Sequence, residues 1–406
     1  MSILRNITNQ AKKYLDNDQI MLFIGPRQAG KTTILKQLQD FLKQTGQETF
    51  FLNLEDPDYL DLLNRSPKNL FKIISLNLTK KSFVFIDEIQ YLKNPSNFLK
   101  YFYDEYNGKI KILASGSSAF YLDTKFKDSL AGRKKIYNVL TLSFKEFLRF
   151  KNEEDLSKKD FFNLTLSEKE KIILYFQEYI TYGGYPRVVL SSIEDKIDIL
   201  RDIAYSYIKK DIFEANIKQE EVFYKLFKIL SSQIGSLVNA SELSVTLGVS
   251  KTTIDHYFYV MQKSFHLKLI SPFFKNVRKE LTKMPKVYFL DLGLRNFFSN
   301  NFKTFYERED KGVFLENITF RQLLENYDID EIKFWRTIQK QEIDFVIKDN
   351  LALEIKVQPK LFKKNKYKIF LDNYPEIKVI IVVFDSLDKI IEHFRIINVW
   401  QIEQGI

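Results

Sequence analysis

One short loop near the start of the chain constrains its fold more than any other feature. The loop, Gly25-Pro-Arg-Gln-Ala-Gly-Lys-Thr32, fits the pattern G-x-x-x-x-G-K-[ST]. It lies between an apolar run at 20–24 and a helix-favouring stretch at 32–43. In this context, glycines allow backbone N–H groups to converge on a phosphate at a helix N-terminus. The pattern predicts a buried strand, a phosphate-binding loop and a helix, with an ordinary glycine turn as the alternative.

The residues of this loop have separate expected roles. Lys31 is predicted to reach the β- and γ-phosphates of a nucleotide, and the Thr32 hydroxyl is predicted to bind Mg²⁺. The predicted nucleotide-binding residues are Gly25, Pro26, Arg27, Gln28, Ala29, Gly30, Lys31, Thr32 and Thr33.

A pair of carboxylates further along the chain supports the same interpretation. Asp87 and Glu88 follow the apolar run 83–86, which places them at the carboxyl end of a predicted strand, where open α/β sheets bind ligands. Asp87 is predicted to hold the metal ion, and Glu88 is predicted to polarise the attacking water. We therefore expect an ATP-hydrolysing site with ATP and Mg²⁺ as its cofactors.

The order of apolar runs predicts the fold class. Helix-like sequence separates the runs at 20–24, 49–54, 83–86, 110–114 and 136–142. Strands that alternate with helices indicate an α/β domain with a parallel, doubly wound sheet. The later parts of the chain are predicted to be helical over 160–235, to have short helices and then strands over 236–275, and to mix both from 286.

Composition excludes several kinds of site. The chain has 406 residues, no cysteine and three dispersed histidines, so disulfides, thiol nucleophiles, cysteine zinc sites and histidine clusters are excluded. An apolar run of six residues at 379–384 is far shorter than the roughly 20 residues of a membrane span. The N-terminal segment lacks the apolar core of a signal peptide. We expect a cytoplasmic protein without a membrane partner. Its net charge of +10 is compatible with a nucleic-acid partner, and equally with a Lys-rich composition.

The segment from Ile24 to Gln90 resembles the archaeal-type AAA+ ATPases that are allied to the signal-transducing STAND class. The resemblance extends to Leu113-Ala-Ser-Gly-Ser-Ser118, to Ser129-Leu-Ala-Gly-Arg133 with the following Leu142-Ser-Phe-Lys-Glu-Phe-Leu148, and to Gly183-Gly-Tyr-Pro186. It implies that Ser115 is the polar sensor after the fourth strand.

The same resemblance implies roles for two further residues. Arg133 would stabilise transition-state charge, either in its own subunit or in a neighbouring one, and the second case requires a homo-oligomer. Alternatively, Arg133 begins a solvated basic turn. Pro186 would lie near the adenine, whereas the glycines before it could form an ordinary helix C-cap. The predicted catalytic residues are Lys31, Glu88, Ser115 and Arg133.

Residues 240–257 have a helix–turn–helix pattern. Ala240 and Leu243 are predicted to pack inward, Gly248 to form the turn, and Ser250 to cap the second helix. A second helix of this kind enters the DNA major groove. Its predicted DNA-contacting residues are Lys251, Thr252, Thr253 and His256. The alternative is a rigid spacer or a protein-binding module.

A second set of carboxylates lies near the C-terminal end. Asp344 on one predicted strand, followed by Glu354-Ile-Lys356 on the next, would place two carboxylates and an ammonium on one face of a hairpin. Two carboxylates suit Mg²⁺, and the lysine could orient a water for phosphodiester attack. The pattern resembles PD-(D/E)xK nuclease-like domains, and Glu316 matches the acidic residue of their first helix. The usual proline before the aspartate is replaced by Ile343, and the alternative is a domain that keeps the fold without cleaving.

The sequence thus predicts four parts: an AAA+ P-loop core, a helical lid, a winged helix and a nuclease-like domain. Their predicted ranges are 1–150, 151–235, 236–285 and 286–406. We expect ATP binding and hydrolysis to control how the later parts engage DNA. The alternatives are an ATP-dependent DNA endonuclease and an ATP-driven assembly switch whose C-terminal modules bind proteins.

Overall fold

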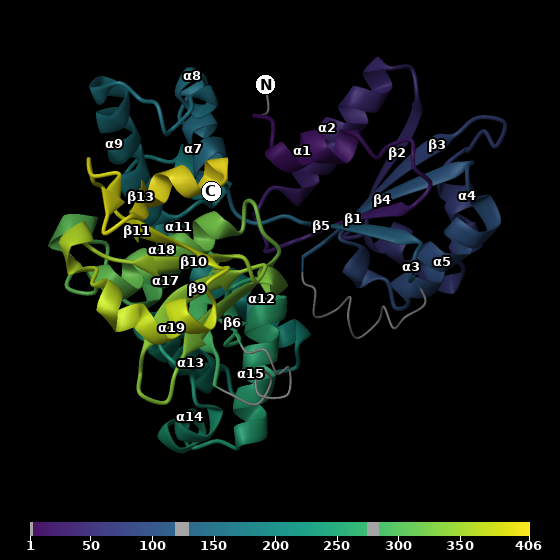
Figure 1. Ribbon diagram of the computed structural model, residues 1–406. Helices are drawn as coiled ribbons and strands as arrows, with labels where there is room; N and C mark the ends of the chain where they lie inside the picture. The colour runs from purple at the N-terminus through teal and green to yellow at the C-terminus, as the bar shows by residue number, and fades with distance from the viewer. Residues whose placement is uncertain (1–2, 118–129, 274–283) are drawn as a thin grey trace. The chain divides into compact units, whose positions relative to one another are not determined.

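The computed structural model describes residues 3–117, 130–273 and 284–406 (Figure 1). The chain forms two compact units. The first comprises residues 1–141, 207–217 and 263–265, and the second comprises the rest. The first unit therefore ends earlier than the predicted core, at Thr141, and includes a short segment of the predicted lid.

A five-stranded parallel sheet forms the centre of the first unit. Its strand order is β2-β3-β4-β1-β5, and every neighbouring pair is parallel. The strands are β1 (Ile20–Ile24), β2 (Glu48–Asn53), β3 (Ser82–Asp87), β4 (Ile110–Gly116) and β5 (Lys134–Asn138). The predicted α/β fold with a parallel sheet is confirmed.

Helices cover both faces of this sheet (Figure 1). The helices are α1 (Asn6–Lys12), α2 (Lys31–Gln44), α3 (Pro57–Arg65), α4 (Leu70–Ile73) and α5 (Pro95–Tyr106). The first unit also includes α12 (Ile208–Glu214). Two of these helices begin at residues typical of helix starts. Asp56 and Asn94 stand directly before a proline, and their side chains accept the backbone N–H groups of Asp58 and Asn97. Apolar side chains of α1 and α2 pack with those of β1, β3, β4 and β5 in one continuous core.

The second unit begins with a group of helices. They are α7 (Phe144–Phe150), α8 (Glu154–Lys158), α9 (Leu166–Tyr182), α10 (Pro186–Leu190), α11 (Lys196–Asp202) and α13 (Glu220–Ser232). Reciprocal side-chain and backbone hydrogen bonds between Ser143 and Glu146, and between Thr165 and Glu168, fix the first turns of α7 and α9.

A helix–turn–helix with a two-stranded hairpin follows. It consists of α14 (Ala240–Leu247), α15 (Lys251–Lys263), β6 (Leu267–Ile270) and β7 (Lys286–Phe289). Gly248 adopts the left-handed conformation at the turn (φ 67°), and the Ser250 hydroxyl accepts the Thr253 N–H at 3.1 Å. Leu243 is buried as expected, but Ala240 is only half-buried. The part of the predicted winged helix at 274–283 lies outside the described residues.

A mixed six-stranded sheet completes the second unit, in the order β12-β13-β11-β10-β9-β8. Its strands are β8 (Ile332–Arg336), β9 (Glu342–Ile347), β10 (Leu351–Ile355), β11 (Lys378–Val383), β12 (Ile390–Ile391) and β13 (Phe394–Asn398). The helices of this part are α17 (Leu292–Phe298), α18 (Lys311–Leu323) and α19 (Lys368–Asn373). β9 and β10 are antiparallel neighbours, as the predicted hairpin requires.

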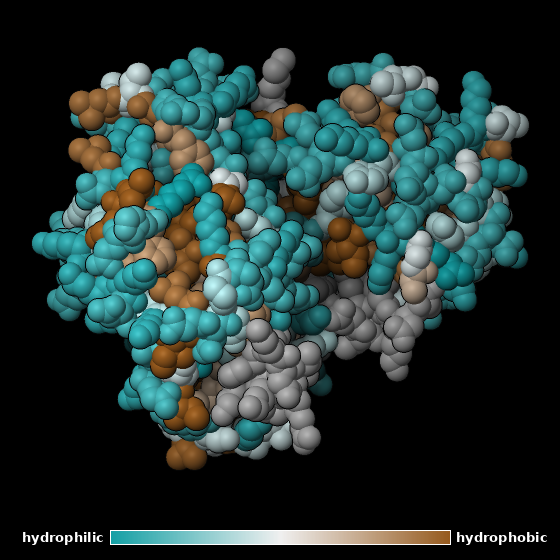
Figure 2. All heavy atoms as spheres, viewed as in Figure 1, coloured by the Kyte–Doolittle hydropathy of each residue, from teal (hydrophilic) through white to brown (hydrophobic). Residues whose placement is uncertain are grey.

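In the described part of the chain, no helix combines the length and the apolar character needed to cross a membrane. On the face shown in Figure 2, hydrophilic side chains predominate and apolar ones form separate patches.

Candidate functional site

The predicted phosphate-binding loop connects the end of β1 to the start of α2. Gly30 adopts the left-handed conformation (φ 93°) directly before the helix. Gly25 passes so close to Val139 that a Cβ atom would lie 1.9 Å from the Val139 carbonyl oxygen. The loop therefore needs glycine at both positions, once for backbone conformation and once for space.

Lys31 is the first residue of α2, and its ammonium points back into the loop. Nζ donates hydrogen bonds to the carbonyl oxygens of Gly25 and Pro26, both at 2.9 Å. The residue is only 5% exposed, and burial lowers the pKa of Lys31 to about 8. A buried ammonium that donates to backbone carbonyl oxygens is suited to receive an anion in their place.

Thr32, Asp87 and Ser115 form a hydrogen-bonded group at the carboxyl edge of the sheet. The Thr32 hydroxyl donates to Asp87 Oδ2 at 2.7 Å, and the Ser115 hydroxyl donates to Asp87 Oδ1. The group forms because β3 and β4 are parallel neighbours and end at the same edge. A carboxylate beside a hydroxyl offers the oxygen ligands that Mg²⁺ prefers, so these residues fit the predicted metal ion.

Glu88 lies next to this group in a left-handed conformation (φ 58°). Its backbone N–H donates to the Ser115 hydroxyl at 3.0 Å. The buried Gln90 side chain donates to the Glu88 carboxylate and to the Ser117 hydroxyl, the latter at 2.8 Å. Gln90 thus holds the predicted catalytic carboxylate, a role that the sequence analysis did not assign.

Arg27 of the loop pairs with carboxylates of α12. Its guanidinium contacts Glu214 and lies 3.9 Å from Asp211. Although burial opposes the charge, these two carboxylates raise the pKa of Arg27. The pairing is consistent with the assignment of α12 to the first compact unit. The sequence offered no signal for it, because more than 180 positions separate the partners.

Arg133 lies at the amino ends of the strands, whereas the loop lies at their carboxyl ends. Its carbonyl accepts the N–H of Ile20 at 2.9 Å, at the amino end of β1, and its Nε donates to Asp104 at 2.8 Å. A five-residue strand such as β1 spans about 17 Å, far beyond the reach of an arginine side chain. The charge-stabilising role of Arg133, in its own subunit or in a neighbouring one, stays a prediction.

The Gly183-Gly184 pair has a clear packing role within the second unit. Gly183 caps α9 with a positive φ of 80°. Gly184 donates its N–H to Asp291 at 2.9 Å and accepts the N–H of Leu142 at 2.8 Å. Pro186 is the first residue of α10. The C-cap alternative is what the structure contains, and the adenine contact of Pro186 stays a prediction.

The predicted DNA-contacting residues lie on α15. Lys251, Thr252 and His256 are exposed, and Thr253 is half-buried. Lys251 forms an ion pair with Asp255 at 2.7 Å. Tyr257 and Phe258 are buried, so they belong to the core of this module.

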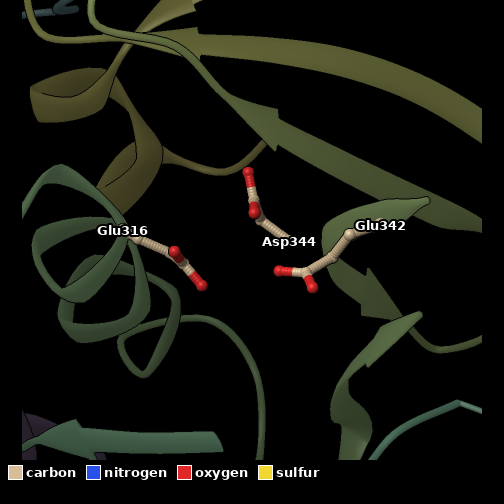
Figure 3. A group of neighbouring side chains, drawn as sticks. All are labelled: Glu316, Glu342 and Asp344. Carbon is tan, nitrogen blue, oxygen red and sulfur yellow. The ribbon is translucent and has the colours of Figure 1, made fainter. Parts of the chain in front are cut away.

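The C-terminal carboxylates form a cluster that differs from the predicted set. Glu316 from α18 and Glu342 and Asp344 from β9 each offer an oxygen within 4.8 Å of the other two, a grouping found among the described residues (Figure 3). We refer to these three residues as the carboxylate cluster. Glu342 was missed, although it stands two residues before Asp344 and so shares its side of the strand.

Lys286 of β7 supplies the positive charge for this cluster. Its Nζ lies 2.7 Å from Glu316, 2.5 Å from Glu342 and 4.0 Å from Asp344. Burial opposes the charge, but the three carboxylates raise the pKa of Lys286 above its usual range. Lys286 was not predicted, because its distance along the sequence from the carboxylates matches no known motif.

Glu354 and Lys356 form a separate pair beside the cluster. Lys356 contacts the Glu354 carboxylate, which also accepts the Tyr367 hydroxyl at 2.8 Å. Burial, followed by the nearby Asp344, raises the pKa of Glu354 to about 8. As arranged, the cluster does not fit a divalent metal, because an ammonium already contacts two of its carboxylates and the predicted Glu354 lies outside the group.

Two segments of the chain match models of known protein families. Residues 17–148 match the model of an AAA domain, and residues 173–304 match a domain of unknown function. An uncharacterized protein of Haemophilus influenzae is 28% identical over 84% of this chain and 82% of its own length. An uncharacterized protein of Methanocaldococcus jannaschii is 27% identical over 92% of this chain and 84% of its own.

A weaker similarity exists to the structure of AMPPCP-bound DnaA from Aquifex aeolicus. It has 16% identity and a TM-score of 0.34, and it covers 64% of this chain and 89% of that chain. The parallel sheet and the phosphate-binding loop both lie within the segment 17–148 that matches the model of an AAA domain.

Proposed function

We propose that this protein is a Mg²⁺-dependent ATPase whose nucleotide state controls how its C-terminal modules engage DNA. The observation that carries the proposal is the hydrogen-bonded group of Thr32, Asp87 and Ser115, with Glu88 adjacent, at the edge of the sheet where the phosphate-binding loop begins.

The residues of this edge divide the chemistry of hydrolysis among them. Lys31 would exchange the carbonyl oxygens of Gly25 and Pro26 for phosphate oxygens. Thr32 and Asp87 would hold Mg²⁺, which neutralises charge on the phosphates when bound. Glu88 would orient the attacking water. Ser115 supports both carboxyl residues, since its hydroxyl contacts Asp87 and accepts the Glu88 N–H.

Two further parts of the proposal concern assembly and nucleotide contact. Arg133 would act on the nucleotide of a neighbouring subunit, so we propose a homo-oligomer. Pro186 would contact the adenine. The four predicted ranges, 1–150, 151–235, 236–285 and 286–406, remain our proposal for the functional modules.

The order of elements supports a winged helix as the DNA-binding module. Helix α13 precedes Leu237, which bridges to Lys286 of β7, and α14, α15 and the β6–β7 hairpin follow. An exposed Lys251 at the start of α15 is suited to a phosphate or a base edge.

Anisotropy of a labelled DNA duplex would test this part. We expect the affinity of the wild type for the duplex to fall steeply as the salt concentration rises from about 50 to about 200 mM. We also expect this affinity to differ between the protein bound to an ATP analogue and the protein bound to ADP. Lys251→Glu should weaken binding. Lys225→Glu is a matched control, because Lys225 forms an equivalent i,i+4 pair and is equally exposed, at 60% against 59%. Equal losses in both variants, or no binding at low salt, would contradict the DNA proposal.

A protein-binding assembly switch is the second candidate. The observation that favours it is the ammonium of Lys286 within the carboxylate cluster, because a cluster arranged in this way does not fit the metal that cleavage needs. ATP-dependent oligomerisation without DNA binding or cleavage would support this candidate.

A further inference from the structure

We propose that Lys286 acts as a built-in cation that occupies the carboxylate cluster and keeps divalent metal out of it. In this arrangement strand β7 controls the cluster, and metal enters only when β7 withdraws its lysine. The inference deepens the C-terminal part of the proposed function and rests on it. Its test needs neither ATP hydrolysis nor DNA binding.

Four side chains from three elements converge on one point. Figure 3 shows Glu316 extending from a helix toward Glu342 on the neighbouring strand, with Asp344 beside them. Lys286 arrives from β7, and its Nζ lies 2.7 Å from Glu316 and 2.5 Å from Glu342. Its side chain is only 1% exposed. The ammonium thus occupies the space that a shared metal ion would need.

The charges explain why this position requires a cation. Three carboxylates in a largely buried site repel one another, and each unpaired buried charge is strongly unfavourable. Lys286 offsets part of this charge, and the Tyr288 hydroxyl, from the same face of β7, donates to Glu316. Without the lysine, the same oxygens form a set that a hard divalent ion prefers.

The strand that carries Lys286 also connects to the helix–turn–helix. Gly235 donates its N–H to Val287 at 2.9 Å, Val238 donates to Pro285 at 2.8 Å, and Leu237 bridges to Lys286. These residues lead directly into α14. Gly235 also lies against the cluster, because a Cβ atom there would be 2.9 Å from Glu316 Oε2. A displacement of this segment would therefore move Lys286 relative to α18 and β9.

The test is a Mn²⁺ titration of the full chain without nucleotide, followed by calorimetry or by the electron paramagnetic resonance of free Mn²⁺. We expect Lys286→Met to bind Mn²⁺ at least about tenfold more tightly than the wild type, which is the lower end of the effect of changes beside a metal site. Adding Asp344→Asn to this variant should remove the gain. Lys286→Arg, which keeps the cation, should show none.

Lys196→Met is the matched control for the loss of a buried lysine. Lys196 is also buried and ion-paired, to Glu178 at 3.3 Å, and it donates to the backbone carbonyls of Val188 and Ser191 rather than to a member of the cluster. This variant should be destabilised without any gain in Mn²⁺ binding.

A second variant covers the case in which Lys286→Met does not fold. Lys286→Gln retains a donor for the carboxylates, and it should show the same gain in Mn²⁺ affinity. Folding of either variant only when Mn²⁺ is present would also support the proposal. A folded variant that binds Mn²⁺ no more tightly than the wild type would overturn it, as would failure of both variants to fold with and without Mn²⁺. In those cases, Lys286 is a structural ion-pair partner only. Unchanged ATP turnover in the folded variants would keep this result separate from the ATPase proposal.

Discussion

The buried position of Lys31 predicts that the affinity for nucleotide depends on pH. Burial lowers the pKa of Lys31 to about 8, from an ordinary value of about 10.4. The difference corresponds to about 3 kcal/mol in favour of the neutral amine. A bound triphosphate favours the ammonium and raises this pKa again, so binding above pH 8 requires uptake of a proton.

The size of the effect follows from the charged fraction of Lys31. With a pKa of about 8, roughly nine-tenths of the free protein carries the ammonium at pH 7 and roughly one-tenth at pH 9. The affinity for nucleotide should therefore fall about tenfold between these pH values. Titration with a fluorescent, non-hydrolysable ATP analogue at pH 7, 8 and 9 would measure it.

Lys31→Arg is the control for this experiment, because a guanidinium stays charged over the whole range. Its nucleotide affinity should be lower but nearly independent of pH, and any contribution from the ionisation of the nucleotide itself would appear in both proteins. A wild-type affinity that changes less than about twofold, or an equal fall in Lys31→Arg, would refute the reasoning.

Three further predictions concern other sites. Ser115→Ala removes the hydroxyl that contacts Asp87, so ATP turnover should fall about 10²-fold with little change in nucleotide affinity; unchanged turnover would contradict this role. Gly184→Ala would place a Cβ atom 2.5 Å from the carbonyl oxygen of Leu142, so it should lower the free energy of unfolding by more than about 2 kcal/mol. Gly312→Ala is the control: a Cβ atom there would have no atom within 4 Å, and the free energy of unfolding should change little. Thermal or denaturant unfolding would separate these two variants. The pKa of Glu354 is raised to about 8 in the folded protein, so the folded state binds the carboxyl proton of Glu354 more tightly than the unfolded state does. The stability that this proton contributes therefore falls as the pH rises from about 4.3 through about 8. Glu354→Gln should flatten that part of the pH profile, and identical profiles would argue against the shift.

The local parts of the nucleotide site could be predicted from the sequence. The strand, loop and helix around Lys31 are continuous in the chain, and the alternation of apolar runs determined where Asp87 would lie. A parallel sheet brings the carboxyl ends of its strands together, so the sequence places Asp87 near the loop, whereas Ser115 is predicted there only by the family resemblance.

Contacts between distant segments could not be predicted in this way. Arg27 pairs with α12, and Lys286 pairs with α18 and β9; both depend on tertiary packing that leaves no periodic signal. For Arg133, a recognisable motif did not reveal its position in the fold. The motif resembles one with a role at the nucleotide, but the parallel pairing of β5 with β1 places Arg133 at the amino ends of the strands, away from the loop.

The central claim is that Glu88 activates water for ATP hydrolysis at this site. The most direct test is a single-turnover measurement with radiolabelled ATP and Mg²⁺ on the wild type and Glu88→Gln, which is nearly isosteric but cannot accept a proton. We expect both proteins to bind ATP with similar affinity, and we expect the wild type to convert it to ADP while Glu88→Gln retains it intact. Hydrolysis by Glu88→Gln at the wild-type rate, or absence of ATP binding in the wild type, would contradict the account.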